Sequence, residues 1–244
     1  TGTGAFMSKK SDAKKLAKSI LNTATRFDKN SVALITNMDQ PLGNAVGNAL
    51  EIIESIEVLK GNGPKDLTEL SLALAAHMIH IGGVEATYSK ALKAAKNSIK
   101  DGSALNKFRE LIKNQNGDET VIDDYSRLPQ AKSSTEVLSQ QTGWIKSFKC
   151  DQIGLLATEL GGGRKVKTDK IDFGGGFIFH KKIGDKVKAG ESIFTIYHNQ
   201  DQTNEVKYIN DRFFDEVVTF SKTKVEKPKT IHEVIEAKKP KKKA

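Results

Sequence analysis

Two histidines, His77 and His80, lie three residues apart in a segment whose apolar pattern predicts a helix over residues 66–80. Side chains at this spacing share one face of a helix, so both imidazoles could ligate the same transition metal. Such a site needs further ligands, and no third ligand is evident nearby in the sequence. We therefore interpret both residues as core or surface histidines.

Asp39 and two glycine runs are the other candidates for chemistry. No second carboxylate is spaced to work with Asp39 as a catalytic acid, so we expect this loop residue to accept hydrogen bonds from the backbone. Gly161–Gly163, followed by Arg164, could cradle an anion, but the strand and helix that flank a phosphate-binding loop are absent. We expect a loop there, and tight strand packing at Gly174–Gly176.

The first half of the chain predicts helices that alternate with a buried strand. Apolar residues recur every three or four positions over residues 9–28, and the β-branched run Ser31–Thr36 is typical of a strand buried in a parallel sheet. A helix is expected over residues 42–60, with Gly43 and Gly47 on one face for close packing. Further helices are expected over residues 66–80, 85–99 and 103–115. This alternation predicts a mixed α/β domain.

The pattern changes after Pro129 to glycine-punctuated, β-branched and aromatic segments. Strands are expected within residues 143–148, 174–191 and 192–197, and a helix over residues 204–220. The stretch Gly184–Glu191 is similar to the half-barrel of biotinyl and lipoyl domains, but no lysine is displayed at a hairpin tip. We therefore expect a barrel-sandwich-like fold without the carrier function. The expected divisions are an α/β domain (1–132), a β-rich domain (133–222) and a Lys/Pro-rich tail (223–244).

Composition and charge exclude several classes of protein. The 244 residues are 37% hydrophobic and 28% charged, which is typical of globular proteins and not of fibres or disordered chains. No apolar run approaches the ~20 residues that cross a bilayer, and the single cysteine, Cys150, makes no internal disulfide, so we expect a cytoplasmic protein without a membrane partner. The net charge is +9, but the last eight residues carry five lysines and no acid. We expect a solvated, disordered tail there and no nucleic-acid partner, because lysine far outnumbers the arginine that base readout favours.

A set of motifs spans nearly everything before the lysine tail. The longest and most specific runs from Met38 to Glu51. The others are Thr3–Met7, Gly61–Leu70, Arg127–Ala131, Gly161–Arg164, Asp169–Asp172, His180–Asp185 and Ile231–Ile235. Together they closely resemble the pyrimidine-nucleoside phosphorylases, the relatives of thymidine phosphorylase.

The resemblance implies a pentosyltransferase of nucleoside salvage. In this family, inorganic phosphate attacks the anomeric carbon of uridine, thymidine or deoxyuridine and releases the free base and a pentose 1-phosphate. The family's Lys-His-Ser-Thr-Gly-Gly phosphate loop, and the arginine and lysine that hold the base, have no counterpart in this sequence. We therefore expect the catalytic residues upstream of this chain, in a C-terminal fragment that is inactive alone. The resemblance also implies a homodimer, formed through a helical domain that precedes this portion.

The same resemblance assigns site residues. Phe6 corresponds to a phenylalanine that lines the pyrimidine pocket, whereas from the residues alone a helix staple or a core phenylalanine is the alternative. The main-chain carbonyls of Leu42 and Ala45 and the carboxylate of Glu54 would hold a monovalent cation such as K⁺, or Ca²⁺, with further ligands from the phosphate loop. Without the resemblance, Glu54 is a solvated helix charge.

Two other functions stay open at this point. A non-catalytic remnant or binding module would expose apolar surface and would self-associate. A carrier of a transferred group would need a modified lysine within residues 184–191.

Overall fold

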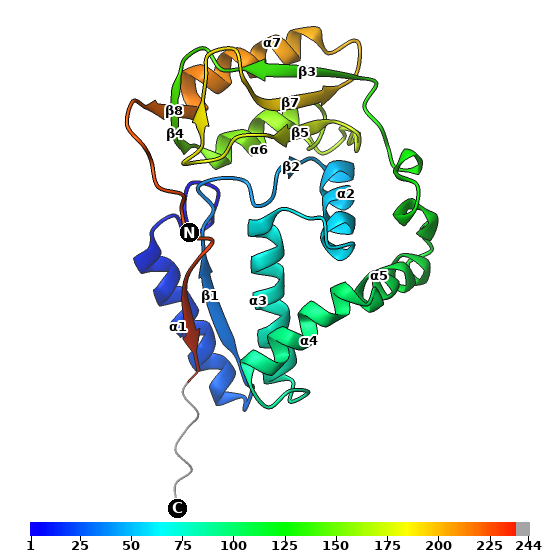
Figure 1. Ribbon diagram of the computed structural model, residues 1–244, viewed down its shortest axis with the longest axis vertical. Helices are drawn as coiled ribbons and strands as arrows, with labels where there is room; N and C mark the ends of the chain where they lie inside the picture. Colours follow the sequence, from blue (N-terminus) through cyan, green and yellow to red (C-terminus); the bar gives the residue numbers. More distant parts are fainter. Residues whose placement is uncertain (238–244) are drawn as a thin grey trace, which may run out of the picture.

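The computed structural model describes residues 1–237, and its mixed α/β fold confirms the predicted fold class. A helical part forms the lower half of Figure 1, and a β-rich part lies above it. The helical part contains α1 (Lys10–Arg26), β1 (Val32–Thr36), α2 (Asn48–Leu59), α3 (Lys65–Ile81), α4 (Tyr88–Lys100), α5 (Ser103–Asn114) and β9 (Ile231–Glu236). The 3-10 turns η1 (Glu119–Ile122) and η2 (Tyr125–Arg127) lead upward.

The β-rich part consists of two facing sheets and two helices. Its elements are β2 (Ala45–Val46), β3 (Ser133–Leu138), β4 (Gly143–Phe148), α6 (Cys150–Glu159), β5 (Gly176–Phe179), β6 (Lys186–Val187), β7 (Ser192–His198), α7 (Thr203–Arg212), the π-helical turn η3 (Phe213–Val217) and β8 (Val218–Ser221). One sheet has the order β2-β5-β7-β3 and the other β6-β4-β8. Buried aromatic rings fill the core, with Phe179 and Phe194 stacked at 5.0 Å between centroids. The predicted strands are confirmed, whereas α6 was not predicted.

The β6–β7 connection bears on the carrier interpretation. β6 pairs with β4, and β7 pairs with β5 and β3, so the turn at residues 188–191 joins two different sheets. It is closed by the Glu191 carboxylate, which accepts from the backbone N–H of Lys188 at 2.9 Å. The described chain therefore has no two-stranded hairpin displaying a lysine at this point.

The helix expected over residues 42–60 is wrong over its first six positions, residues 42–47. Gly43 and Gly47 have φ angles of +71° and +140°, so neither has helical backbone and they do not share a helical face. Ala45 instead pairs with Ile178 in the β-rich sheet, and α2 begins at Asn48. A Cβ on Gly176 would come within 2.2 Å of the Val46 carbonyl, so the expected tight strand packing is confirmed there.

Two further strand predictions need correction. β1 pairs antiparallel with β9, with Leu34 opposite Val234, so within residues 1–237 it does not belong to a parallel sheet. Figure 1 shows β9 returning from the β-rich part to lie beside β1. The expectation of a tail from residue 223 is therefore wrong for residues 231–236, because a strand with two charged positions is recognisable only through its partner. The predicted disorder of the lysine-rich end falls on residues 238–244, which lie outside the described residues. The helix predicted over residues 204–220 ends at Arg212, where the π-helical turn and β8 follow.

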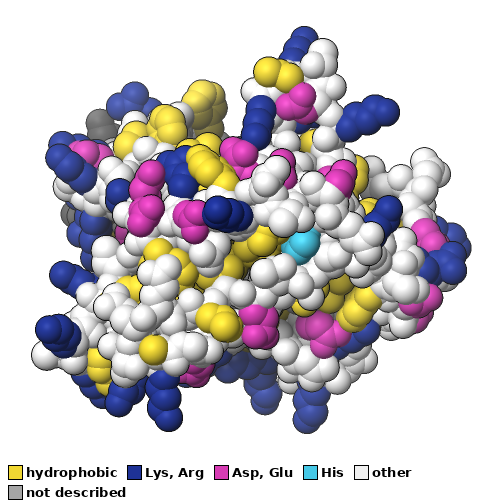
Figure 2. Space-filling view, turned by 90° about the horizontal axis from the view of Figure 1, so that it is seen from above, with side chains coloured by type: hydrophobic (Ala, Val, Ile, Leu, Met, Phe, Trp, Pro, Cys, Tyr) yellow, Lys and Arg dark blue, Asp and Glu magenta, His cyan; other side chains and the backbone are white. Residues whose placement is uncertain are grey.

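The surface over the β-rich part carries charges of both signs. Figure 2 shows lysines and arginines spread around the rim of this face, with acidic side chains between them. Within residues 1–237, no helix is both long and apolar enough to span a membrane.

Candidate functional site

Most of the longest motif, Met38–Glu51, forms the connection between β1 and α2. We refer to residues 37–47 as the cation loop because they contain Leu42 and Ala45, two of the three expected cation ligands. The N-terminal turn lies against its first residues: the backbone N–H of Gly4 donates to the Met38 carbonyl at 2.9 Å. The N–H of Thr3 donates to Asp39 Oδ1 at 3.1 Å. The prediction that Asp39 accepts hydrogen bonds from backbone is thereby confirmed.

Phe6 projects from this N-terminal turn. Its side chain is 94% exposed, so it is neither a core residue nor a helix staple within the described chain. An aromatic ring exposed to this degree gains little from its own chain and is available to pack against another group. Its place in a base pocket stays a prediction.

Glu54, in the second turn of α2, holds the far end of the cation loop. Its Oε1 accepts from the backbone N–H groups of Asn44, at 2.7 Å, and Ala45, at 3.1 Å. A Cβ on Gly43 would lie 2.1 Å from Glu54 Oε2, so only glycine leaves room for the carboxylate. Burial raises the pKa of the Glu54 carboxyl, and the two N–H donors and Lys182 oppose that rise. Glu54 is therefore part of the loop structure, and the alternative of a solvated helix charge is wrong.

Lys182 completes the arrangement from the β-rich part. Its Nζ donates to the carbonyl of Pro41 at 2.5 Å, to the carbonyl of Gly43, and to Asp66 Oδ2 at 3.1 Å. The same Asp66 oxygen accepts from the N–H of Gly43 at 3.3 Å. Nothing in the sequence singles out Lys182, although its motif, His180–Asp185, is part of the family resemblance.

The cation loop also forms one wall of a cavity of about 570 Å³ beside Lys182. The other walls come from the start of α3 and from the segment at residues 227–231. Lys65, Lys182 and Lys227 line it together with Asp66 and Asp185. The cleft is therefore of mixed charge, and a cation near the loop would lie beside both carboxylates and ammonium groups.

The loop fits the expected cation in the chemistry of its donors. Leu42 lies between the two residues whose carbonyls accept from Lys182, and Ala45 donates its N–H to Glu54. The carbonyls of Leu42 and Ala45, with the Glu54 carboxylate, make an all-oxygen set. Hard cations such as K⁺ and Ca²⁺ prefer such sets. Glu54 Oε2 accepts no hydrogen bond from residues 1–237, which leaves that oxygen free to ligate an ion.

The two histidines are engaged elsewhere. The His77 ring packs against Tyr88 with centroids 4.5 Å apart, and His80 Nδ1 lies 3.0 Å from the carbonyl of Glu85. Burial lowers the pKa of His77. Among the residues that the structure describes, no three His, Cys, Asp or Glu side chains are grouped so that they could hold a metal ion.

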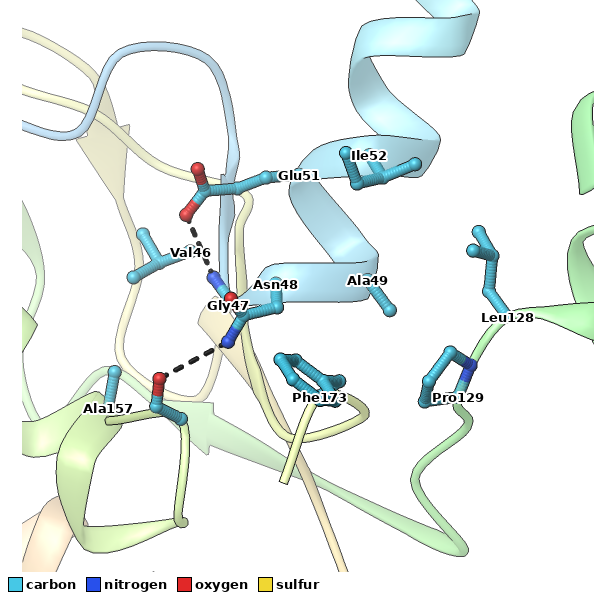
Figure 3. Close-up of a pocket in the computed structure, with 11 residues that line it drawn as sticks. Val46, Gly47, Asn48, Ala49, Glu51, Ile52, Leu128, Pro129, Ala157 and Phe173 are labelled. Carbon is cyan, nitrogen blue, oxygen red and sulfur yellow. Dashed lines mark hydrogen bonds between the residues drawn. The ribbon is translucent and has the colours of Figure 1, made fainter. Parts of the chain in front are cut away.

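A second cavity, also of about 570 Å³, opens at the start of α2 (Figure 3). Asn48 Nδ2 donates to the carbonyl of Gly162 at 3.2 Å, and Glu51 accepts from the N–H of Gly47 at 3.1 Å. Residues 161–164 form a loop here, as predicted. Phe6 and the three expected cation ligands line neither this cavity nor the one beside Lys182. The candidate site, the cation loop and the turn that carries Phe6, rests on the hydrogen bonds of Glu54 and Lys182 and on the exposed ring, and not on a cavity.

Comparison with known proteins agrees with the motifs. Residues 144–211 match the family model described as the pyrimidine nucleoside phosphorylase C-terminal domain. The chain is 41% identical to the pyrimidine-nucleoside phosphorylase of Geobacillus stearothermophilus, over 96% of this chain and 53% of the relative. It is 42% identical to that of Staphylococcus aureus strain USA300, with the same coverage. The chain therefore spans about half the length of the curated relatives that it matches. Along nearly all of its own length, it is related to the pyrimidine-nucleoside phosphorylases, as its motifs predicted.

Proposed function

We propose that this chain is part of a pyrimidine-nucleoside phosphorylase that cleaves uridine, thymidine and deoxyuridine with inorganic phosphate. The observation that carries the proposal is the identity of 41% along 96% of the chain, which includes the motif that builds the cation loop. We also propose the family's homodimer as its assembly and nucleoside salvage in the cytoplasm as its setting. The lone cysteine supports a reducing compartment.

The reaction sets physical demands that this chain meets in part. Phosphorolysis needs a cationic cradle for phosphate, donors for the charge that grows on the departing pyrimidine, and exclusion of water, which would compete with phosphate. We assign Phe6 to packing against the pyrimidine, for which its exposed ring supplies a flat apolar surface. The phosphate loop and the donors to the base are not among the residues of this sequence. We therefore propose that a polypeptide of residues 1–244 alone does not catalyse phosphorolysis.

A bound cation is part of the same proposal. The carbonyls of Leu42 and Ala45 and the carboxylate of Glu54 would hold K⁺ or Ca²⁺, with the remaining ligands from the family's phosphate loop. When bound, the ion would supply positive charge that neutralises Glu54. Glu54 itself holds the backbone of Asn44 and Ala45, which keeps the loop folded back onto α2.

The experiment compares two preparations, the polypeptide of residues 1–244 and the complete natural protein, each incubated with uridine. Uracil is measured by chromatography with and without inorganic phosphate. We expect uracil only from the complete protein and only with phosphate. Phosphate-dependent uracil from residues 1–244 would refute the proposed inactivity. No uracil from either preparation would refute the enzyme and favour the binding-module alternative.

A further inference from the structure

We propose that Lys182 is the positioning residue of the cation loop, through which the β-rich part sets the cation affinity. The inference rests on the proposed cation site and adds to it a residue that is not one of the ligands. The Lys182 ammonium touches the loop on both sides of Leu42, at the carbonyls of Pro41 and Gly43.

All three ammonium protons of Lys182 are accepted. Two go to the loop carbonyls and the third to Asp66, and the side chain is only 15% exposed. Charge-assisted hydrogen bonds are stronger than neutral ones, and a largely buried ammonium depends on having all its partners. The ammonium therefore fixes the direction of the carbonyls at residues 41 and 43, and Leu42 between them has little freedom.

The loop is held from two directions by groups of opposite charge. Lys182 holds its carbonyls, while Glu54 holds its N–H groups at Asn44 and Ala45. Asp66 adds a further contact beside Lys182, because its Oδ2 accepts from both Lys182 and the N–H of Gly43. The orientation of both predicted carbonyl ligands thus depends on this network of hydrogen bonds.

Lys182 is itself held in place by its neighbours in the chain. Its backbone N–H donates to Asp185 Oδ2 at 2.9 Å, and Asp185 pairs with Lys227 at 2.7 Å. The next residue, Ile183, donates its N–H to Gln40 Oε1 at 2.9 Å. The turn at residues 182–185 is therefore attached to the cation loop through both backbone and side chain, as a rigid support requires.

The experiment measures cation affinity through stability, without using activity. The Tm of the complete natural protein is measured in increasing KCl, with choline chloride keeping the ionic strength constant. The half-rise concentration is the K⁺ concentration that gives half of the K⁺-specific increase in Tm. A parallel series uses CaCl₂. The variants are Lys182→Met, Lys182→Arg and, as the matched control, Lys181→Met, whose ammonium pairs with Glu191 and not with the loop. Removing groups that orient ligands typically weakens metal binding about 10–100-fold.

We expect the half-rise concentration to increase at least about tenfold in K182M, to recover partly in K182R and to change less than about twofold in K181M. An unchanged value in K182M overturns the role of Lys182 and leaves the cation site standing. A lower value also overturns it and shows that the ammonium competes with the ion. No ion-specific rise in the unmodified protein refutes the cation site itself.

A second variant keeps the test decisive if K182M does not fold, as judged by circular dichroism. Lys182→Gln keeps an amide that can donate to two of the three acceptors. We expect K182Q to fold and to shift the half-rise concentration in the same direction by a smaller factor. In the same variant, we expect the amide protons of Asn44 and Ala45 to exchange faster than in K181M. Equal exchange in K182Q and K181M would contradict the positioning role.

Discussion

Replacing Gly43 with alanine tests the contact between the cation loop and Glu54. Gly43 has φ +71°, and an added Cβ would lie 2.1 Å from Glu54 Oε2 and 2.8 Å from its Cδ. A side chain in the left-handed region costs about 1–2 kcal/mol. Displacing the carboxylate also breaks at least one charge-assisted bond to Asn44 or Ala45, each of about 1.5–3 kcal/mol. We therefore expect G43A to lower the free energy of unfolding by about 3–5 kcal/mol.

Gly61 provides the matched control. It follows the C-cap of α2 with φ +87°, and a Cβ there would meet nothing within 4 Å. G61A therefore suffers the backbone strain without the clash, and we expect a loss of about 1–2 kcal/mol. In a Glu54→Ala background the clash is absent, so G43A should cost no more than G61A. The double-mutant cycle then gives a coupling of at least about 1.5 kcal/mol between residues 43 and 54.

The assay is urea unfolding followed by circular dichroism, with thermal scans as a check. For a chain of this size each kcal/mol moves Tm by about 2–4 °C, so G43A should lower Tm by about 6–20 °C. Equal losses in G43A and G61A, within about 0.5 kcal/mol, would refute the contact with Glu54 and with it the geometry of the cation loop.

Three further predictions concern other residues. Phe6→Ala should leave the free energy of unfolding within about 0.5 kcal/mol of the wild-type value, because the ring is exposed, yet raise KM for uridine in the complete protein about tenfold or more. Phe27→Ala, at a residue that is 72% exposed, is the control that should change neither quantity. Burial raises the pKa of the Cys150 thiol to about 11, so at pH 8 its reaction with a disulfide reagent should be about a hundredfold slower than in urea-unfolded protein; equal rates would contradict this. The hydrogen bond from the Thr120 hydroxyl chiefly lowers the pKa of Asp118 to about 2, so its stabilising contribution is complete above the ordinary aspartate value and is lost as the pH falls through about 2. The free energy of unfolding of Asp118→Asn, measured in urea, should accordingly fall less steeply below pH 4 than that of wild type. Parallel curves of unfolding free energy against pH would refute the assignment.

The elements that sequence predicted well are those whose pattern is local. The amphipathic helices α1, α3 and α5 follow from apolar spacing, and α3 and α5 also from glycine or proline at their ends; all three are found within a few residues of the expected bounds. The turn before α2 was missed because Gly43 and Gly47 are as compatible with small residues on a helix face as with a turn. Only their positive φ angles decide between the two. β9 was missed because its recognition depends on β1, about 200 residues earlier in the chain.

The site shows the same division. The acceptor role of Asp39 was predictable because a short polar side chain in a loop favours backbone donors, whereas its donor, the N–H of Thr3, lies 36 residues earlier and was not. The contacts of Lys182 were not predictable, because nothing in a lysine-rich sequence distinguishes the one lysine whose ammonium donates to Pro41, Gly43 and Asp66. Chemistry that is assembled from distant segments becomes visible only in three dimensions.

The most direct test of the central claim follows phosphorus in the complete natural protein. Uridine and inorganic phosphate are supplied, and ³¹P NMR monitors the phosphate signal while chromatography measures uracil. We expect a pentose 1-phosphate signal that grows as inorganic phosphate declines, in a one-to-one ratio with uracil. Uracil that appears without any change in the phosphorus spectrum would show hydrolysis and contradict the assignment as a phosphorylase.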